Sequence, residues 1–113
     1  MQAYDLAELL RLRASIDRPY LEFLRVPDLS AGLYVLRAGD EDRQTPHSEP
    51  ELYYVVSGAA TVTVGAEDRP VSAGALVFVD AGAPHRFHTI TEDLTLLVVF
   101  APAEYARAGA AAP

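Results

Sequence analysis

All three histidines of this 113-residue chain lie in two short segments near its middle. The first segment, 39–58, contains His47, with two glutamates close behind it. The second, 74–89, contains His85 and His88. The chain has no cysteine, and without thiolates imidazole and carboxylate groups are the usual ligands of a divalent transition metal. The two segments therefore indicate a candidate metal site.

Strand parity narrows the candidates only in part. Alternate residues of a strand point to the same face. In an unbroken strand, one face would carry Thr45, His47, Glu49 and Glu51. Because proline cannot donate to a strand ladder, the prolines at positions 46 and 50 argue against unbroken pairing here. Parity alone leaves both Glu49 and Glu51 open as ligands.

The second segment separates its two histidines. His85 follows a turn of small residues and proline, and in a regular strand it shares a face with Phe87. His88 then points to the opposite face. We interpret His88 as a surface or packing residue, which leaves His85 as the candidate ligand of this segment.

The rest of the chain predicts mostly strands, which would position these residues. An apolar periodicity predicts a short helix over 4–14, and moderate alternation predicts an edge strand over 20–26. Stretches rich in valine, threonine and aromatic residues predict further strands over 32–38, 51–57, 59–64, 75–80, 85–90 and 94–100. Short strands at close, even spacing are typical of an all-β sandwich or small barrel.

The first segment follows the spacing of a known motif. Gly39, His47, Glu51 and Gly58 stand where the first motif of the cupin superfamily has a glycine, a histidine, a glutamate and a closing glycine. The chain thus resembles the small single-domain cupins. It departs from their pattern at Thr45, which occupies the position of the first motif histidine. The same spacing favours Glu51 over Glu49 as the glutamate ligand.

The second segment resembles the second cupin motif. Gly74, Gly82 and His85 match it, whereas Asp80 and Thr89 replace its proline and its asparagine. Two motifs in the correct order are a strong indication of fold and a weak indication of reaction, because many chemistries share this fold.

The resemblance spans residues 30–101, the cupin core of a predicted single domain over 1–113. It implies an all-β fold: a double-stranded β-helix, or jelly-roll barrel, with a short N-terminal helix. The small residues at 106–113 predict a disordered tail.

The resemblance also implies that His47, Glu51 and His85 are ligands of one divalent metal inside the barrel. Two imidazoles and a carboxylate suit Fe, Mn, Ni, Cu or Zn and leave coordination positions open. Because the first motif histidine is missing, three alternatives for a further ligand stay open. Thr45 could bind weakly, a water could take the position, or Gln44 could move in.

Aromatic and aliphatic side chains are expected around this site. Tyr53, Val55, Phe78 and Phe87 are predicted to face the barrel interior and line an apolar cavity, although small barrels also use such residues simply as core. The acidic loop 40–42 is interpreted as a solvated surface loop.

Composition limits the partners. A net charge of -7 disfavours nucleic acid and anionic membranes, since both are negatively charged. No signal-peptide pattern and no apolar run of ~20 residues is visible. These features and the lack of cysteine predict a cytoplasmic protein. The apolar edge strand predicts a homodimer.

Two functions are consistent with these features. The first is a metal-dependent enzyme acting on a small organic molecule, as an oxygenase, an isomerase or a lyase. The second is a non-catalytic module that binds or senses a small molecule in the barrel cavity. The altered motif at Thr45 favours the second function, and the open positions of a three-residue ligand set favour the first.

Overall fold

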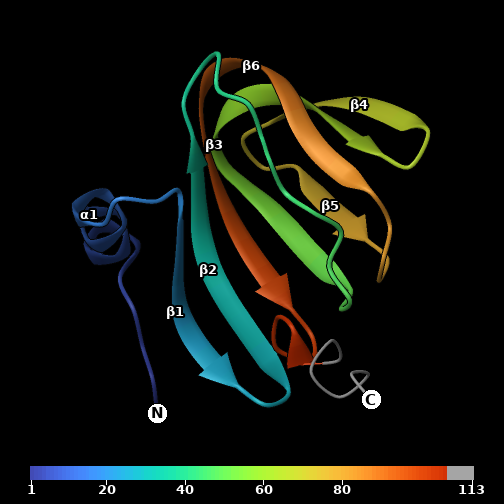
Figure 1. Ribbon diagram of the computed structural model, residues 1–113. Helices are drawn as coiled ribbons and strands as arrows, with labels where there is room; N and C mark the ends of the chain where they lie inside the picture. The colour runs from blue at the N-terminus through green and yellow to red at the C-terminus, as the bar shows by residue number, and fades with distance from the viewer. Residues whose placement is uncertain (107–113) are drawn as a thin grey trace.

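A computed structural model describes residues 1–106 as one short helix and six strands (Figure 1). The elements are α1 (Leu6–Ser15), β1 (Tyr20–Val26), β2 (Leu29–Leu36), β3 (Glu51–Val64), β4 (Glu67–Ser72), β5 (Leu76–Val79) and β6 (His85–Phe100). The all-β fold with an N-terminal helix is confirmed. None of the helices in the described residues is long and apolar enough to cross a membrane.

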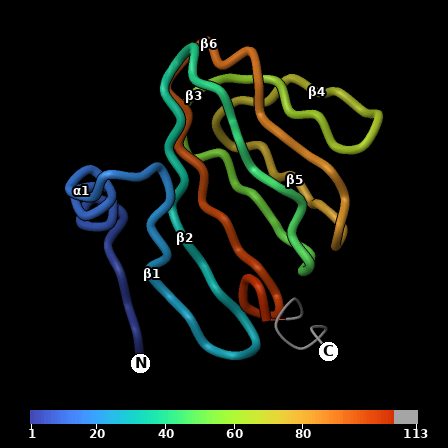
Figure 2. The backbone as a smooth tube through the Cα atoms, viewed as in Figure 1, coloured from blue at the N-terminus to red at the C-terminus, as the bar shows by residue number. Residues whose placement is uncertain are grey.

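All strands pair antiparallel. The sheet order is β1-β2-β6-β3-β4, and β5 pairs with the first half of β3. β3 and β6 are the central strands. β3 pairs with β5 along its first half and with β4 along its second half, while β6 pairs with β3 along its length and with β2 along its second half. Figure 2 shows β6 turning near its middle, so that its first half runs beside the second half of β3 and its second half lies beside β2.

The bends in β3 and β6 explain a difference from the sequence prediction. Strands were expected over 51–57 and 59–64, and these form a single strand; so do 85–90 and 94–100. The pairing of β3 with β6 shifts register three times between Val55 and Thr61. Gly58 lies in this irregular stretch with a positive φ. The Ser57–Gly58 pair is typical of a turn, but here the chain bends without ending the strand.

The remaining elements lie close to their expected places. The helix begins at Leu6 and ends at Ser15, where 4–14 was expected, and the edge strand over 20–26 is confirmed. β4 was not predicted, since its sequence is rich in charged residues and contains a proline, with Val71 as its only β-branched residue. Residues 107–113 lie outside the described residues, so the predicted tail at 106–113 stays a prediction.

The core lies between the two halves of the bent sheet. Its buried side chains include Tyr53, Val55, Phe87, Leu94, Leu96, Val98 and Phe100. These residues come from β3 and β6, whose alternating burial pattern places every second side chain inside. α1 lies against β1 and β2, away from this interior (Figure 1).

The prediction that Phe78 lines the interior is wrong. Phe78 is 59% exposed, and it pairs in register with Leu52, which is also exposed. Val77 and Val79 take the inward positions of β5 instead. A strand's inward parity depends on its pairing register, and a shift of one residue exchanges the two faces.

Candidate metal centre

Three of the predicted ligands come together at one end of the barrel. Within residues 1–106, His47, Glu51 and His85 offer ligand atoms that all lie within 4.8 Å of one another, and all three residues are buried. Glu51 is the first residue of β3 and His85 the first of β6, while His47 lies in the loop before β3. Glu51 pairs with Val79 at the end of β5, and in the loop from β5 to β6 the N–H of Gly82 donates to the carbonyl of His47 at 2.7 Å. These contacts bring the two strand starts and the loop together.

Both ring nitrogens of His85 face acceptors. Nδ1 lies 3.0 Å from the carbonyl oxygen of Ala83, and a carbonyl can only accept. Nε2 lies 2.7 Å from Oε1 of Glu51 and 3.0 Å from the hydroxyl of Tyr53. Burial lowers the pKa of His85, but the contact with Glu51 and the Ala83 carbonyl outweigh it and hold the pKa above its ordinary value.

This arrangement fits a bound cation. The carbonyl of Ala83 fixes a proton on Nδ1, so that Nε2 is the nitrogen with a lone pair to offer in the neutral ring. That lone pair faces the Glu51 carboxylate, whose two oxygens are buried and receive no hydrogen bond of normal geometry from the described part of the chain. Two such groups repel unless a positive charge lies between them. A proton on Nε2 or a metal ion meets this requirement, so the residues fit a metal.

His47 is held by residues from the end of the chain. Its ring packs edge-on against Phe100, at a centroid distance of 4.8 Å, and against Tyr105 at 5.7 Å. Nδ1 lies 3.2 Å from Oε2 of Glu104. Burial lowers the pKa of His47, which favours the neutral ring that binds metal.

The two glutamates have different roles. Glu49 is buried but is not part of the three-residue group. Its Oε1 accepts the backbone N–H of Tyr105 at 2.5 Å, and its Oε2 accepts the hydroxyl of Ser48. Glu49 therefore fastens the chain after β6 to the loop that carries His47.

The Asp42 carboxylate forms a second hydrogen-bond network, which reaches the site through Gln44 and Tyr53. Asp42 accepts hydrogen bonds from the Tyr34 hydroxyl at 2.7 Å, the backbone N–H of Phe87 at 2.8 Å and the Gln44 side chain at 2.8 Å. The Oε1 atom of Gln44 accepts the hydroxyl proton of Tyr53 at 2.8 Å. The expectation that the whole loop 40–42 is solvated is wrong for Asp42, which is buried.

This network bears on the alternative ligands. The Gln44 amide donates to Asp42 and accepts from Tyr53, so a move to the metal would break two buried hydrogen bonds. Thr45 lines the neighbouring cavity, as His47 does. Thr45 and a water therefore both stay open as the further ligand.

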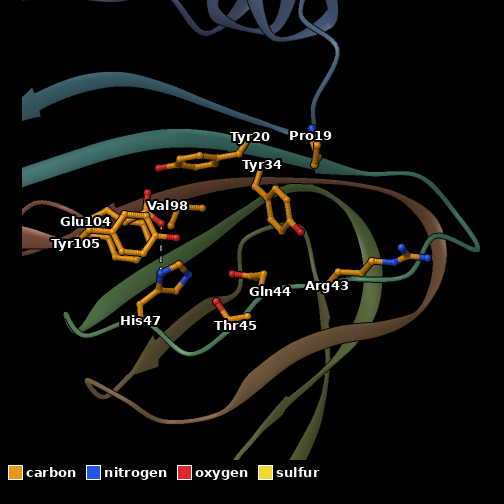
Figure 3. Close-up of a pocket in the computed structure, with 11 residues that line it drawn as sticks. Pro19, Tyr20, Tyr34, Arg43, Gln44, Thr45, His47, Val98, Glu104 and Tyr105 are labelled. Carbon is orange, nitrogen blue, oxygen red and sulfur yellow. Dashed lines mark ion pairs between the residues drawn. The ribbon is translucent and has the colours of Figure 1, made fainter. Parts of the chain in front are cut away.

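A cavity of about 470 Å³ opens beside the cluster (Figure 3). It is lined by Pro19, Tyr20, Tyr34, Arg43, Gln44, Thr45, His47, Val98, Phe100, Glu104 and Tyr105. His47, Glu104 and Tyr105 gather at one end and Arg43 lies toward the other. Tyr53, Val55 and Phe87 face the interior as expected, but they are buried in the core and are not among the lining residues of this cavity.

Sequence reasoning missed Tyr20, Asp42 and Glu104. Tyr20 begins the edge strand, and Glu104 stands in a short stretch of alanine and proline after the last strand. No periodicity or motif marks either residue. Only the pairing of strands distant in sequence brings them to the cavity.

Metal affinity is expected to fall as the pH is lowered from 8 to 6. His85 has a pKa above its ordinary value, so a proton increasingly competes for Nε2 over this range, at up to about tenfold in affinity per pH unit for one displaced proton. Calorimetry in buffers of different ionisation enthalpy would measure the proton release. If the metal affinity stays constant with pH, the metal does not displace a proton from His85.

Comparison with known proteins places the fold. A family model described as the cupin domain matches residues 32–100, more than half of the chain. The chain belongs to the cupin family. An uncharacterized protein of Streptomyces coelicolor is 52% identical to this cupin over 104 residues, which cover 92% of this chain and 99% of that protein.

Solved structures agree on the architecture of this cupin. TT1209 from Thermus thermophilus is 27% identical, with a TM-score of 0.74 and coverage of 91% of this chain and 99% of that one. The DMSP lyase DddQ from Ruegeria pomeroyi is 26% identical, with a TM-score of 0.63. That alignment covers 67% of this chain but only 39% of the lyase.

Proposed function

We propose that this cupin binds one divalent transition metal through His47, Glu51 and His85 and accepts a small organic ligand in the adjoining cavity. The observation that carries the proposal is the position of His47, which belongs both to the ligand cluster and to the cavity lining. A molecule in the cavity therefore lies beside the metal position. When bound, the metal would supply Lewis-acid or redox chemistry to that molecule.

The cavity suits a partly apolar molecule with an oxygen acceptor. Phe100, Val98 and the ring faces of the tyrosines provide apolar contact. The Tyr20 hydroxyl is buried and has no hydrogen-bond partner among the residues that the structure describes. Burial and the nearby carboxylates of Glu104 and Glu22 raise the pKa of Tyr20, so this hydroxyl stays protonated and can donate. A carbonyl, carboxylate or hydroxyl oxygen of a ligand would satisfy it.

Two classes of function use such a site. One is a metal-dependent oxygenase, isomerase or lyase; likeness to a lyase in fold supports the class only weakly, because this chain spans 39% of that protein. The other is a non-catalytic binding or sensing cupin, which Thr45 favours, because it replaces a metal-binding imidazole with a weak donor. The cytoplasmic location and the homodimer stay predictions.

Metal loading followed by elemental analysis tests the proposal. Protein freed of metal by a chelator and loaded separately with Fe, Mn, Ni, Cu and Zn is expected to retain about one ion per chain after gel filtration. Retention of none of these metals would refute it. Screening the loaded protein for turnover of small organic acids and carbonyl compounds then separates the two classes, since a binding module would show affinity without turnover.

Replacing Tyr20 with phenylalanine is expected to leave the unfolding free energy of the metal-free protein unchanged or to raise it by up to about 1 kcal/mol. The change removes a buried hydroxyl that has no hydrogen-bond partner within residues 1–106. The matched control is Tyr34→Phe, which removes the hydroxyl that donates to buried Asp42 and should cost about 1.5–3 kcal/mol. Urea denaturation measures both. Equal losses would mean that Tyr20 has a partner within the protein.

A further inference from the structure

A charged group from outside the family match lies beside the Nδ1 atom of His47. Oε2 of Glu104 lies 3.2 Å from Nδ1, and the side chains of His47 and Glu104 are only 8% and 13% exposed. Glu104 follows the last strand, beyond residues 32–100. The two atoms are in contact but not aligned as a hydrogen bond, so among residues 1–106 Nδ1 is a buried polar atom without a hydrogen-bond partner.

The backbone around Glu104 is fixed from three sides. Its N–H donates to Oγ of Ser30 at 2.8 Å, and its carbonyl accepts from the Arg25 guanidinium at 2.7 Å. The next N–H, that of Tyr105, donates to buried Glu49. These contacts hold the segment 101–106 against the β1–β2 hairpin and against the loop of His47. The carboxylate of Glu104 is therefore placed at the cavity end of this segment, where Figure 3 shows it beside His47.

A carboxylate on one nitrogen of a histidine determines which nitrogen can bind metal. It holds the proton on the nitrogen it faces, orients the ring and raises the basicity of the other nitrogen. Here Nδ1 faces Glu104, which leaves Nε2 as the ligand atom. His85 is held the same way by the carbonyl of Ala83. Because Thr45 leaves this centre with three ligand residues, the orientation of each imidazole counts for more.

We propose that Glu104 is a positioning residue for the metal centre, which holds His47 with its proton on Nδ1 and so makes the C-terminal segment 101–106 part of the site. The inference rests on the proposed metal-binding function. Coupling between two sites is reciprocal. Metal binding should therefore also hold the segment 101–106 more firmly in place.

Substitution of Glu104 tests the inference with Zn²⁺ alone as the probe. Zinc affinity of the full chain is measured by competition with a chromophoric chelator, at a temperature where circular dichroism shows every variant to be folded. Glu104→Ala is expected to weaken binding by about 10–100-fold, as loss of such partners does in other metal sites. Glu104→Gln should recover part of the loss, because its amide oxygen accepts the same hydrogen bond without the charge.

Glu22→Ala is the matched control. The Glu22 side chain is exposed and paired with Arg25, and its charge reaches Glu104, but it makes no contact with His47. Its removal should change zinc affinity by less than about threefold, as expected for an exposed charge screened by solvent. This control separates the contact from the general loss of negative charge.

Two further measurements distinguish a positioning role of Glu104 from a merely structural one, because a structural role would change neither result. Nitrogen-15 NMR of the histidine side chains should show His47 protonated on Nδ1 in the metal-free wild type and a mixture of tautomers in metal-free Glu104→Ala. Hydrogen exchange of the amides of residues 101–106 should slow on zinc binding in the wild type and respond less in the variant.

The outcomes are distinguishable. Wild-type protein that binds zinc while Glu104→Ala binds it equally, with unchanged His47 signals, would overturn this inference and leave the proposed function standing. Wild-type protein that binds no zinc or other divalent metal would overturn the proposed function and this inference together. If Glu104→Ala does not fold, Glu104→Gln is used in its place. A zinc affinity and a His47 tautomer equal to those of the wild type would then count against the inference.

Discussion

Replacing Glu51 with glutamine is expected to weaken metal binding by more than about 100-fold, because loss of an outer partner alone costs 10–100-fold at such sites. Glu51 supplies the only carboxylate in the three-residue group, and its Oε1 lies 2.7 Å from Nε2 of His85. An amide has nearly the same shape but lacks the charge that offsets that of a divalent ion. Metal titration by calorimetry, with circular dichroism to establish folding, would measure the effect.

Glu49→Gln is the matched control for this prediction. Glu49 lies two residues earlier and is equally buried, but it fastens the N–H of Tyr105 and lies outside the ligand group. An amide oxygen can still accept that hydrogen bond. The loss of metal affinity in Glu49→Gln should therefore be at least about tenfold smaller than the loss in Glu51→Gln, because Glu49 does not bind the metal directly. A larger loss in Glu49→Gln would assign the ligand role to Glu49 instead.

Replacing Gly58 with alanine is expected to cost about 3 kcal/mol or more of unfolding free energy, the sum of backbone strain and steric overlap. Gly58 has a φ of +99°, and a Cβ atom there would lie 2.2 Å from the carbonyl oxygen of Asp93 and 2.7 Å from Cα of Leu94. These are backbone atoms of the paired strand β6, so neither can rotate away. A drop in Tm of about 10 °C or more is the corresponding thermal signal.

Gly74→Ala separates strain from overlap. Gly74 has a φ of +94°, nearly that of Gly58, but a Cβ atom there would meet nothing within 4 Å. Only the conformational cost remains, about 1 kcal/mol. Chemical denaturation of both variants measures the difference. Equal losses would mean that the close approach of β3 to β6 at Gly58 does not limit the fold.

That His47, Glu51 and His85 come together could be predicted from the sequence, because the motif spacing that places them is local. The spacing from Gly39 through His47 and Glu51 to Gly58, and from Gly74 to His85, reflects the short stretches that carry ligands to one end of the barrel. The alternation of apolar residues likewise predicted that Tyr53, Val55 and Phe87 point inward, where they form the core.

Features that depend on long-range pairing could not be predicted in this way. Phe78 faces outward because β5 pairs with β3 in one register, which no property of β5 itself specifies. Gly58 reads as a turn, yet β3 continues through it because β6 follows the same bend. The acidic loop gave no sign that Asp42 would be buried, since its partners Tyr34 and Phe87 come from other strands.

The second layer of the site was missed for the same reason. Glu104 reaches His47 only because Ser30, Arg25 and Glu49 fasten the segment after β6. Single residues without periodicity or motif acquire a role from tertiary contacts, and these are absent from the sequence pattern.

Anomalous diffraction from crystals of the metal-loaded protein, collected on both sides of the absorption edge of the metal, tests the central claim most directly. One strong anomalous peak per chain is predicted, about 2.0–2.2 Å from a ring nitrogen of His47, a ring nitrogen of His85 and a carboxylate oxygen of Glu51. A fully loaded crystal with no peak among these three residues, or with its peak bound by other residues, would contradict the claim.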